Sequence, residues 1–148
     1  ISFKNIHNQD CFSIFWLLKN GVSKTFKLSK LTKISFFTAL MNWLTPTKRT
    51  FNGHNTSCYK RDIIAINGFN EEMHYGGLDR EVGERLINFG ILSKQIRYSA
   101  ICLHLDHNRS YANSESWKKN SEIRNFNKKN KIIQVKNGII KYDELKTN

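Results

Sequence analysis

The chain has 148 residues, 39% of them hydrophobic, and carries 24 Lys and Arg against 12 Asp and Glu, which gives a net charge of +12. This length and composition allow a folded core and exclude a disordered chain. Three cysteines without disulfide or zinc-site spacing indicate a reducing compartment, so we expect a cytoplasmic protein. The apolar stretches are shorter than the roughly 20 residues that cross a bilayer, which argues against a spanning helix.

Charge and composition divide the chain into three regions. Residues 1–50 form a basic, helical lead-in, residues 51–114 are neutral overall, and residues 115–148 are basic again. In the first region, lysines recur among aromatic and aliphatic side chains, as in a segment that lies on the inner face of a membrane. An ordinary solvated face over a core is the alternative. The chain begins at Ile1 and not at Met, so we expect a fragment of a longer protein.

Hydrophobic spacing predicts helices and strands in alternation. The predicted helices span residues 29–44, 61–66, 79–90 and 115–130. The predicted strands span residues 55–59, 97–103, 132–135 and 139–142, the last two forming a small hairpin around Asn137-Gly138. The sequence therefore predicts an α/β fold with a basic helix and a small hairpin at its C-terminal end.

Residues 66–90, INGFNEEMHYGGLDREVGERLINFG, carry the strongest functional signal. Gly76 and Gly77 let the backbone pass close to a bulky ligand, because no Cβ stands in the way. Asp79 follows in the first turn of a helix, where the helix dipole favours an ionised carboxylate. Apolar residues three and seven positions later share its face, so we expect the carboxylate to face a cleft. The pattern suits a catalytic base over a glycine floor, and an ordinary acid at a helix start is the alternative.

A second polar cluster, HLDH at residues 104–107, follows the predicted strand over residues 97–103. Its imidazole and carboxylate groups are ligands of divalent ions. Because neighbouring residues of a strand face opposite sides, we expect one ligand from this cluster and not three. A surface histidine pair beside Asp106 is the alternative interpretation.

Three segments of the neutral region resemble the C-terminal half of inverting GT-A glycosyltransferases, of the bacterial family 2 type and the related β-1,4-galactosyltransferases. They are FNGHNTSCYKRDIIAINGF, YGGLDREVGERLINFG and RYSAICLHLDHNRSY, which lie between Phe51 and Tyr111 in the family's order. The resemblance implies the C-terminal half of a GT-A (nucleotide-diphospho-sugar transferase) fold, with residues 51–114 as the catalytic region. It implies transfer of a hexose from a nucleotide-sugar donor to a saccharide or lipid-linked glycan acceptor in surface glycan synthesis.

The resemblance also implies a base and a metal ligand. Asp79 matches the general base on the acceptor hydroxyl. His107 matches the histidine that helps to hold Mn²⁺ or Mg²⁺ on the donor diphosphate, with His104 and Asp106 as weaker candidates. The family's Asp-x-Asp motif is absent from the sequence. We therefore expect the acceptor and base portion of a longer enzyme, inactive alone.

Other positions match the substrate-binding part of the family's motif. Tyr75 takes the place of an aromatic residue, usually tryptophan, that lies against the sugar. Gly76 and Gly77 form the floor beneath it. Leu78 replaces the family's usual glutamate, so we expect altered acceptor use or a weakened activity. Gly53, His54 and Asn55 lie in the loop that lines the junction between donor and acceptor.

Two other function classes fit parts of the sequence. The basic regions would suit a nucleic-acid-binding module without catalysis, but they lie outside the motif-rich centre and carry no nucleic-acid motif, so no nucleic-acid partner is expected. A metal hydrolase could be built on His104, Asp106 and His107, but a second ligand cluster is missing from the sequence.

Overall fold

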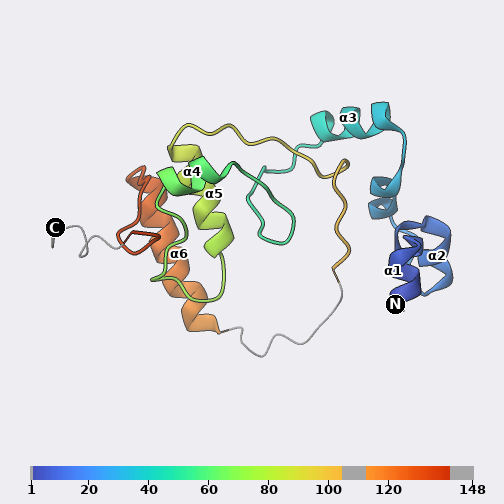
Figure 1. Ribbon diagram of the computed structural model, residues 1–148, viewed down its shortest axis with the longest axis horizontal. Coiled ribbons are helices and arrows are strands. Elements are labelled where there is room, and N and C mark those ends of the chain that lie inside the picture. Colours follow the sequence, from blue (N-terminus) through green and yellow to red (C-terminus); the bar gives the residue numbers. More distant parts are fainter. Residues whose placement is uncertain (1, 105–112, 141–148) are drawn as a thin grey trace. The chain divides into compact units, whose positions relative to one another are not determined.

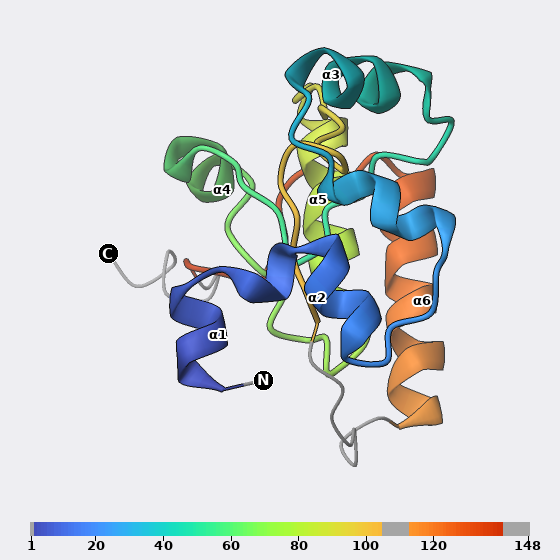
Figure 2. The ribbon, with the colours of Figure 1, turned by 90° about the vertical axis from the view of Figure 1, so that its right-hand side faces the viewer.

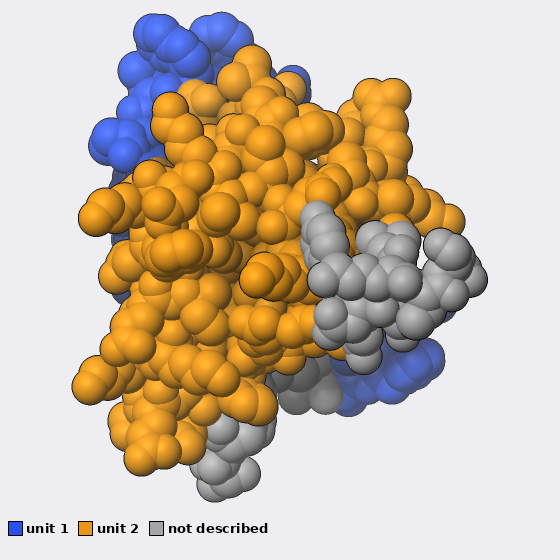
Figure 3. Space-filling view, turned by 90° about the vertical axis from the view of Figure 1, so that its left-hand side faces the viewer, with its two compact units in different colours: residues 1–47, 95–103 blue, residues 48–94, 104–148 orange. Residues whose placement is uncertain are grey.

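The computed structural model describes residues 2–104 and 113–140. Its helices in these ranges are α1 (Phe3–His7), η1 (Asp10–Phe12), α2 (Ile14–Lys19), η2 (Phe26–Leu31), α3 (Ser35–Leu44), α4 (Lys60–Ala65), α5 (Leu78–Asn88) and α6 (Ser114–Lys129), where η marks a 3-10 helix (Figure 1). The chain divides into two compact units, which we call the first unit (residues 1–47 and 95–103) and the second unit (residues 48–94 and 104–148) (Figure 3).

The described residues are helical and contain almost no strand, so the predicted α/β fold, a partial GT-A fold, is not supported. Residues 97–103, predicted as a strand, begin with a turn in which the N–H of Ser99 donates to the carbonyl of Ile96 at 2.9 Å. Residues 55–59 lead into α4 without regular structure, and Asn137 alone forms a bridge in the described part of the predicted hairpin. A strand needs a neighbouring strand for its backbone groups, and within the described residues these segments are not paired into a sheet.

The helix predicted over residues 29–44 is divided in the first unit. η2 ends at Leu31, the backbone at Thr32 is extended (φ −63°, ψ 140°), and α3 begins at Ser35. Apolar spacing continues through the break, which is why the sequence suggests one helix. Within the described ranges, no helix combines the length and apolar character that crossing a membrane requires.

The second unit has a small apolar core between α4 and α5. Ile66, Val82 and Leu86 are buried, and three partly buried side chains pack against them: Phe51, Ile63 and Ile91. α6 lies alongside α5 in both ribbon views (Figure 1 and Figure 2). The core is small, so polar contacts must supply much of what joins the elements.

A buried ion pair supplies the main polar contact. Glu81 and Arg85, four residues apart on α5, are both 0% exposed. Arg85 donates from Nε to Oε1 of Glu81 at 2.7 Å and from Nη2 to Oε2 at 2.9 Å. Glu81 also accepts from Nδ2 of Asn127 on α6, at 2.7 Å. The remaining N–H groups of Arg85 donate to the backbone carbonyls of Ile66, Gly68 and Ile133. All five donors of the guanidinium are therefore used.

Asn67 fastens the C-terminal segment to the end of α4. Its backbone is left-handed (φ 63°), a conformation that asparagine tolerates better than most residues. Its Nδ2 donates to the carbonyls of Val135 and Ile140, both at 2.8 Å, and its Oδ1 accepts from the N–H of Ile140 at 2.8 Å. Residues 132–140 thus fold back onto the α4–α5 connection, where the sequence suggested a hairpin.

The loop before α4 rests directly on α5. A Cβ added to Gly83 would collide with Cβ of Phe51, so the absence of a side chain at this helical position allows the close approach. The same loop continues to Gly53, which contacts the first turn of α5. Gly83 thereby sets how closely residues 51–53 approach the helix.

We expect Arg85→Met to lower the free energy of unfolding by about 3–5 kcal/mol, because Glu81 would stay buried without its partner. Arg124→Met is the matched control. Its ion pair with Glu84, at 2.6 Å, is partly exposed (23% and 26%) and should contribute no more than about 1 kcal/mol. Urea denaturation followed by circular dichroism measures both, and equal losses would contradict the special role of the buried pair.

Candidate functional site

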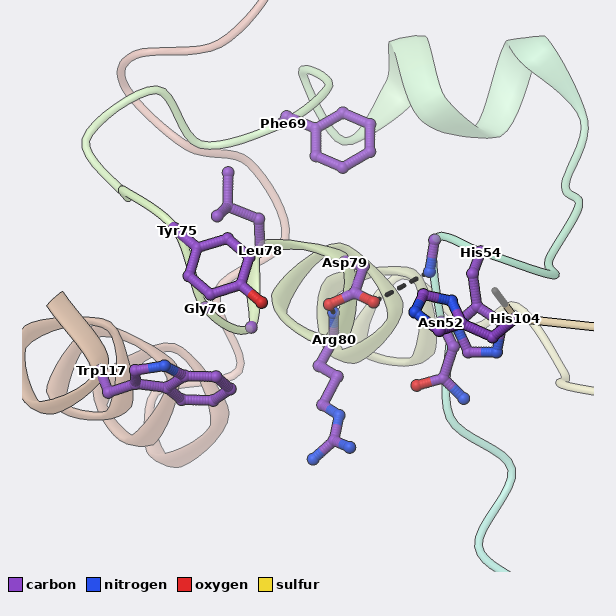
Figure 4. A pocket seen from close by; sticks show the side chains of 12 residues that line it. Asn52, His54, Phe69, Tyr75, Gly76, Leu78, Asp79, Arg80, His104 and Trp117 are labelled. Atoms are coloured by element: carbon purple, nitrogen blue, oxygen red, sulfur yellow. Dashed lines mark hydrogen bonds between the residues drawn. The ribbon is translucent and has the colours of Figure 1, made fainter. Parts of the chain in front are cut away.

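An open hollow of about 630 Å³ lies in the second unit, around the start of α5 (Figure 4). It is lined by residues from the loop before α4, the α4–α5 connection, the first turn of α5, the end of the 95–104 segment and α6. The lining residues are Asn52, Gly53, His54, Phe69, Tyr75, Gly76, Gly77, Leu78, Asp79, Arg80, His104 and Trp117. Most of the substrate-binding residues suggested by the sequence therefore surround one space.

The carboxylate of Asp79 is held in a fixed orientation in this hollow. Gly77, in the left-handed conformation (φ 84°), precedes α5 and places Asp79 in its first turn. The N–H of Gly53 donates to Oδ2 at 2.8 Å, and the N–H of Arg80 donates to Oδ1 at 2.8 Å. Asp79 is half-buried. Each oxygen keeps a further lone pair, so the carboxylate can still accept a proton from a ligand.

Two aromatic rings form one side of the hollow. Tyr75 and Trp117 meet edge to face, with their centroids 6.2 Å apart and their planes at 90°. Both rings remain partly exposed, at 37% and 44%. In the view of Figure 4, the carboxylate of Asp79 lies between this pair and the side chains of Asn52 and His54. The rings therefore offer apolar surface to a ligand that also reaches Asp79.

The backbone at Gly76 and Gly77 passes close to side chains of α6. Gly76 has φ 112°, and a Cβ added there would lie 2.9 Å from the indole ring. A Cβ added to Gly77 would touch Cδ of Arg124 at 3.4 Å. The turn therefore passes under α6 at a distance that only glycine permits at residue 76.

α6 fixes this turn through its polar side chains. Asn120 is 1% exposed, and its Nδ2 donates to successive carbonyls of the turn: His74 at 2.9 Å, Tyr75 at 3.3 Å and Gly76 at 2.7 Å. Arg124 makes a bidentate ion pair with Glu84 of α5. Hydrogen bonding to Glu84 raises the pKa of Arg124, and burial acts in the opposite direction. The shape of the hollow thus depends on a helix distant in sequence.

The remaining predicted site residues lie in several places. His54 and His104 line the hollow, and Leu78 lies at its edge as the first residue of α5. Asn55 is not among the lining residues, and its N–H donates to the carbonyl of Asn52 at 2.9 Å. Asp106 and His107 lie outside the described residues.

The described part of the chain does not by itself fit a divalent metal. Within residues 2–104 and 113–140, no three His, Cys, Asp or Glu side chains come together as a metal site would require. His54 and His104 are the imidazoles at the hollow, and neither belongs to such a group. The ligand role expected of His107 stays a prediction.

Sequence reasoning missed four lining residues, which are Asn52, Phe69, Arg80 and Trp117. The signal for Trp117 was present in α6. Positions 117, 120, 124 and 127 are spaced three and four apart and so share one helix face. That face carries Trp, Asn, Arg and Asn, an unusual set that marks a helix surface buried against polar backbone.

Comparisons of the chain with protein-family models, with curated proteins and with solved structures found no match. The chemistry of the hollow therefore rests on its own geometry and on the sequence motif.

We expect Gly76→Ala to displace Trp117 and shift its fluorescence emission, because the new methyl group overlaps the indole. Gly90→Ala is the matched control, since Gly90 also has a positive φ (98°) but no atom within 4 Å of its added Cβ. Both variants carry the cost of a left-handed alanine, roughly 1–2 kcal/mol. Identical emission spectra would contradict the close approach of the turn to α6.

Proposed function

We propose that the hollow binds a saccharide acceptor and that Asp79 is the general base of an inverting, sugar-nucleotide-dependent glycosyltransferase. One observation carries the proposal: a carboxylate, oriented by the N–H groups of Gly53 and Arg80, lies in an open hollow beside two partly exposed aromatic rings. A base must be oriented and accessible to a ligand hydroxyl; two N–H groups orient this carboxylate, and the hollow around it is open.

The reaction would be a single displacement. Asp79 removes the proton from an acceptor hydroxyl, and the oxygen attacks the anomeric carbon of the donor sugar. The bond between that carbon and the nucleoside diphosphate breaks, and its electron pair leaves with the diphosphate. Attack opposite to the leaving group inverts the anomeric centre, and the proton remains on Asp79 until solvent removes it.

The aromatic pair suits the acceptor. The faces of a sugar ring carry C–H groups, which pack on aromatic surface, while its hydroxyls point outward. Tyr75 and Trp117 would hold such a ring while a hydroxyl reaches Asp79. Leu78, at the edge of the hollow, offers an apolar contact where the similar family has a carboxylate. We propose that the acceptor is accordingly chosen by shape more than by hydrogen bonds at that position.

The donor side of the proposal rests on the resemblance of the sequence and on His107. Within the matched segments between Phe51 and Tyr111, only His107 concerns the donor, and the sequence contains no Asp-x-Asp. A divalent ion with His107 as a ligand would neutralise the departing diphosphate. The proposal for Asp79 does not depend on that ion, nor on the sheet of a GT-A fold.

Asp79→Asn should lower transfer by about 10²–10⁴-fold while leaving donor binding unchanged, because the amide cannot take a proton. Transfer of labelled sugar from nucleotide-sugars to saccharides measures this effect. Glu122→Gln, an exposed position on α6, is the matched control. Full turnover in Asp79→Asn would remove the base assignment.

Tyr75→Ala and Trp117→Ala should each weaken saccharide binding by roughly three- to tenfold, because each removes ring contact with the sugar. Calorimetric titration with a panel of oligosaccharides measures the dissociation constant without any donor. Phe126→Ala, at a 62% exposed position on α6, serves as the control. Binding that is weakened equally by all three changes would place the saccharide elsewhere.

A further inference from the structure

A second surface, in the first unit, has no part in the proposed reaction. α3 presents two faces of different character, and one of them packs within its own unit. Phe37 meets the ring of Tyr98 edge to face at 6.5 Å, and the buried Tyr98 donates its N–H to Oδ1 of Asn42 at 2.8 Å. Nδ2 of Asn42 donates to the hydroxyl oxygen of Ser99 at 2.7 Å. These contacts fix which side of α3 faces inward.

The opposite side of α3 is apolar and exposed. Phe36, Leu40 and Trp43 follow the three-to-four spacing of one helix face and are 77%, 37% and 77% exposed. Leu44 extends this face and is also exposed. We call these four residues the α3 apolar face. The helix contains no charged residue between Ser35 and Leu44, so nothing on it opposes contact with a hydrophobic phase.

Cations gather immediately before this helix. The first unit contains seven Lys and Arg but a single acid, Asp10. Four of the lysines fall within ten residues, Lys24, Lys27, Lys30 and Lys33. Partial burial, together with the nearby charges of Arg97 and Lys27, lowers the pKa of Lys30. The positive charge of this segment is thus locally uncompensated.

A second copy, a nucleic acid and an anionic lipid surface differ in how well they satisfy both features. A second copy of the chain could cover the apolar face but would bring the two lysine clusters toward each other. A nucleic acid would neutralise the lysines but would leave Phe36 and Trp43 in water. An anionic lipid surface takes the apolar side chains at the acyl boundary and the lysines among its headgroups.

We infer that the first unit docks on anionic membrane surfaces through the α3 apolar face and the lysines at positions 24, 27, 30 and 33. The helix would lie in the plane of the interface, because it is too short to cross the bilayer. This docking is independent of the proposed reaction and would hold the second unit close to membrane-bound acceptors.

The test uses the full chain and vesicles of phosphatidylcholine with or without 30% phosphatidylglycerol, separated by flotation. Trp16→Phe combined with Trp117→Phe leaves Trp43 as the only tryptophan. We expect binding only to the anionic vesicles and a blue shift of Trp43 emission on binding. High salt should weaken binding, because the lysine contribution is screened.

Two sets of variants separate the contributions. Lys24→Glu, Lys27→Glu and Lys33→Glu together should reduce binding by about a hundredfold or more, since each lysine near an anionic surface contributes roughly fivefold. Phe36→Ser with Leu40→Ser should reduce it by about tenfold or more. The matched controls are on α6: Lys118→Glu, Lys119→Glu and Lys128→Glu for the charge, and Phe126→Ser for the apolar contact.

Several results would overturn the inference. Equal binding to neutral and anionic vesicles would remove the role of the lysines. Equal losses in the α6 controls would make the effect one of overall charge. Self-association without lipid that Phe36→Ser abolishes would make the α3 apolar face an interface between copies. Circular dichroism of each variant shows whether it remains folded, which we expect for the lysine and phenylalanine replacements and for Leu40→Ser because those side chains are exposed.

Discussion

The second unit depends on a single buried guanidinium. Arg85 joins its own helix to the α4–α5 connection and to the C-terminal segment through hydrogen bonds to Glu81 and to three carbonyl groups. Through Glu81 and Asn127 it also joins α6. Desolvating two charges is costly unless every polar atom is paired, and here the arginine is fully paired. The small apolar core around Ile66 would otherwise have to hold four segments together by itself.

Contacts between α5 and α6 hold one side of the hollow in place. α6 is held against α5 at two levels, by Asn127 on Glu81 and by Arg124 on Glu84. Asn120, between these positions and Trp117, then fixes the carbonyls of the glycine turn. The position of Tyr75 relative to Asp79 therefore follows from contacts made by a helix about 40 residues further along the chain. Preorganisation of this kind is what a binding site requires to hold a ligand in one orientation.

Local signals in the sequence were sufficient where the chemistry was local. The glycine pair before Asp79 and the helix that follows could be read directly, because turn and helix preferences act over a few residues. The segment over 97–103 was misread, because an apolar run can be buried by packing Tyr98 under α3 as well as by pairing in a sheet. Glu81 and Arg85 have the spacing of an ordinary surface pair, and only the packing of α6 shows that they are buried. Trp117 was missed because the spacing of its helix face shows which residues lie together on α6 but does not identify their distant partner, Tyr75.

Gly83 shows how a position outside the lining of the hollow can affect it. It lies one turn after Asp79 on α5 and faces Phe51, so it determines how closely the loop before α4 approaches the helix. The N–H of Gly53, two residues along that loop, is the donor that orients Asp79. Even a methyl group at position 83 would move this donor away and leave the N–H of Arg80 to orient the carboxylate. Variation at position 83 would therefore alter the orientation of Asp79 without changing a residue that lines the hollow.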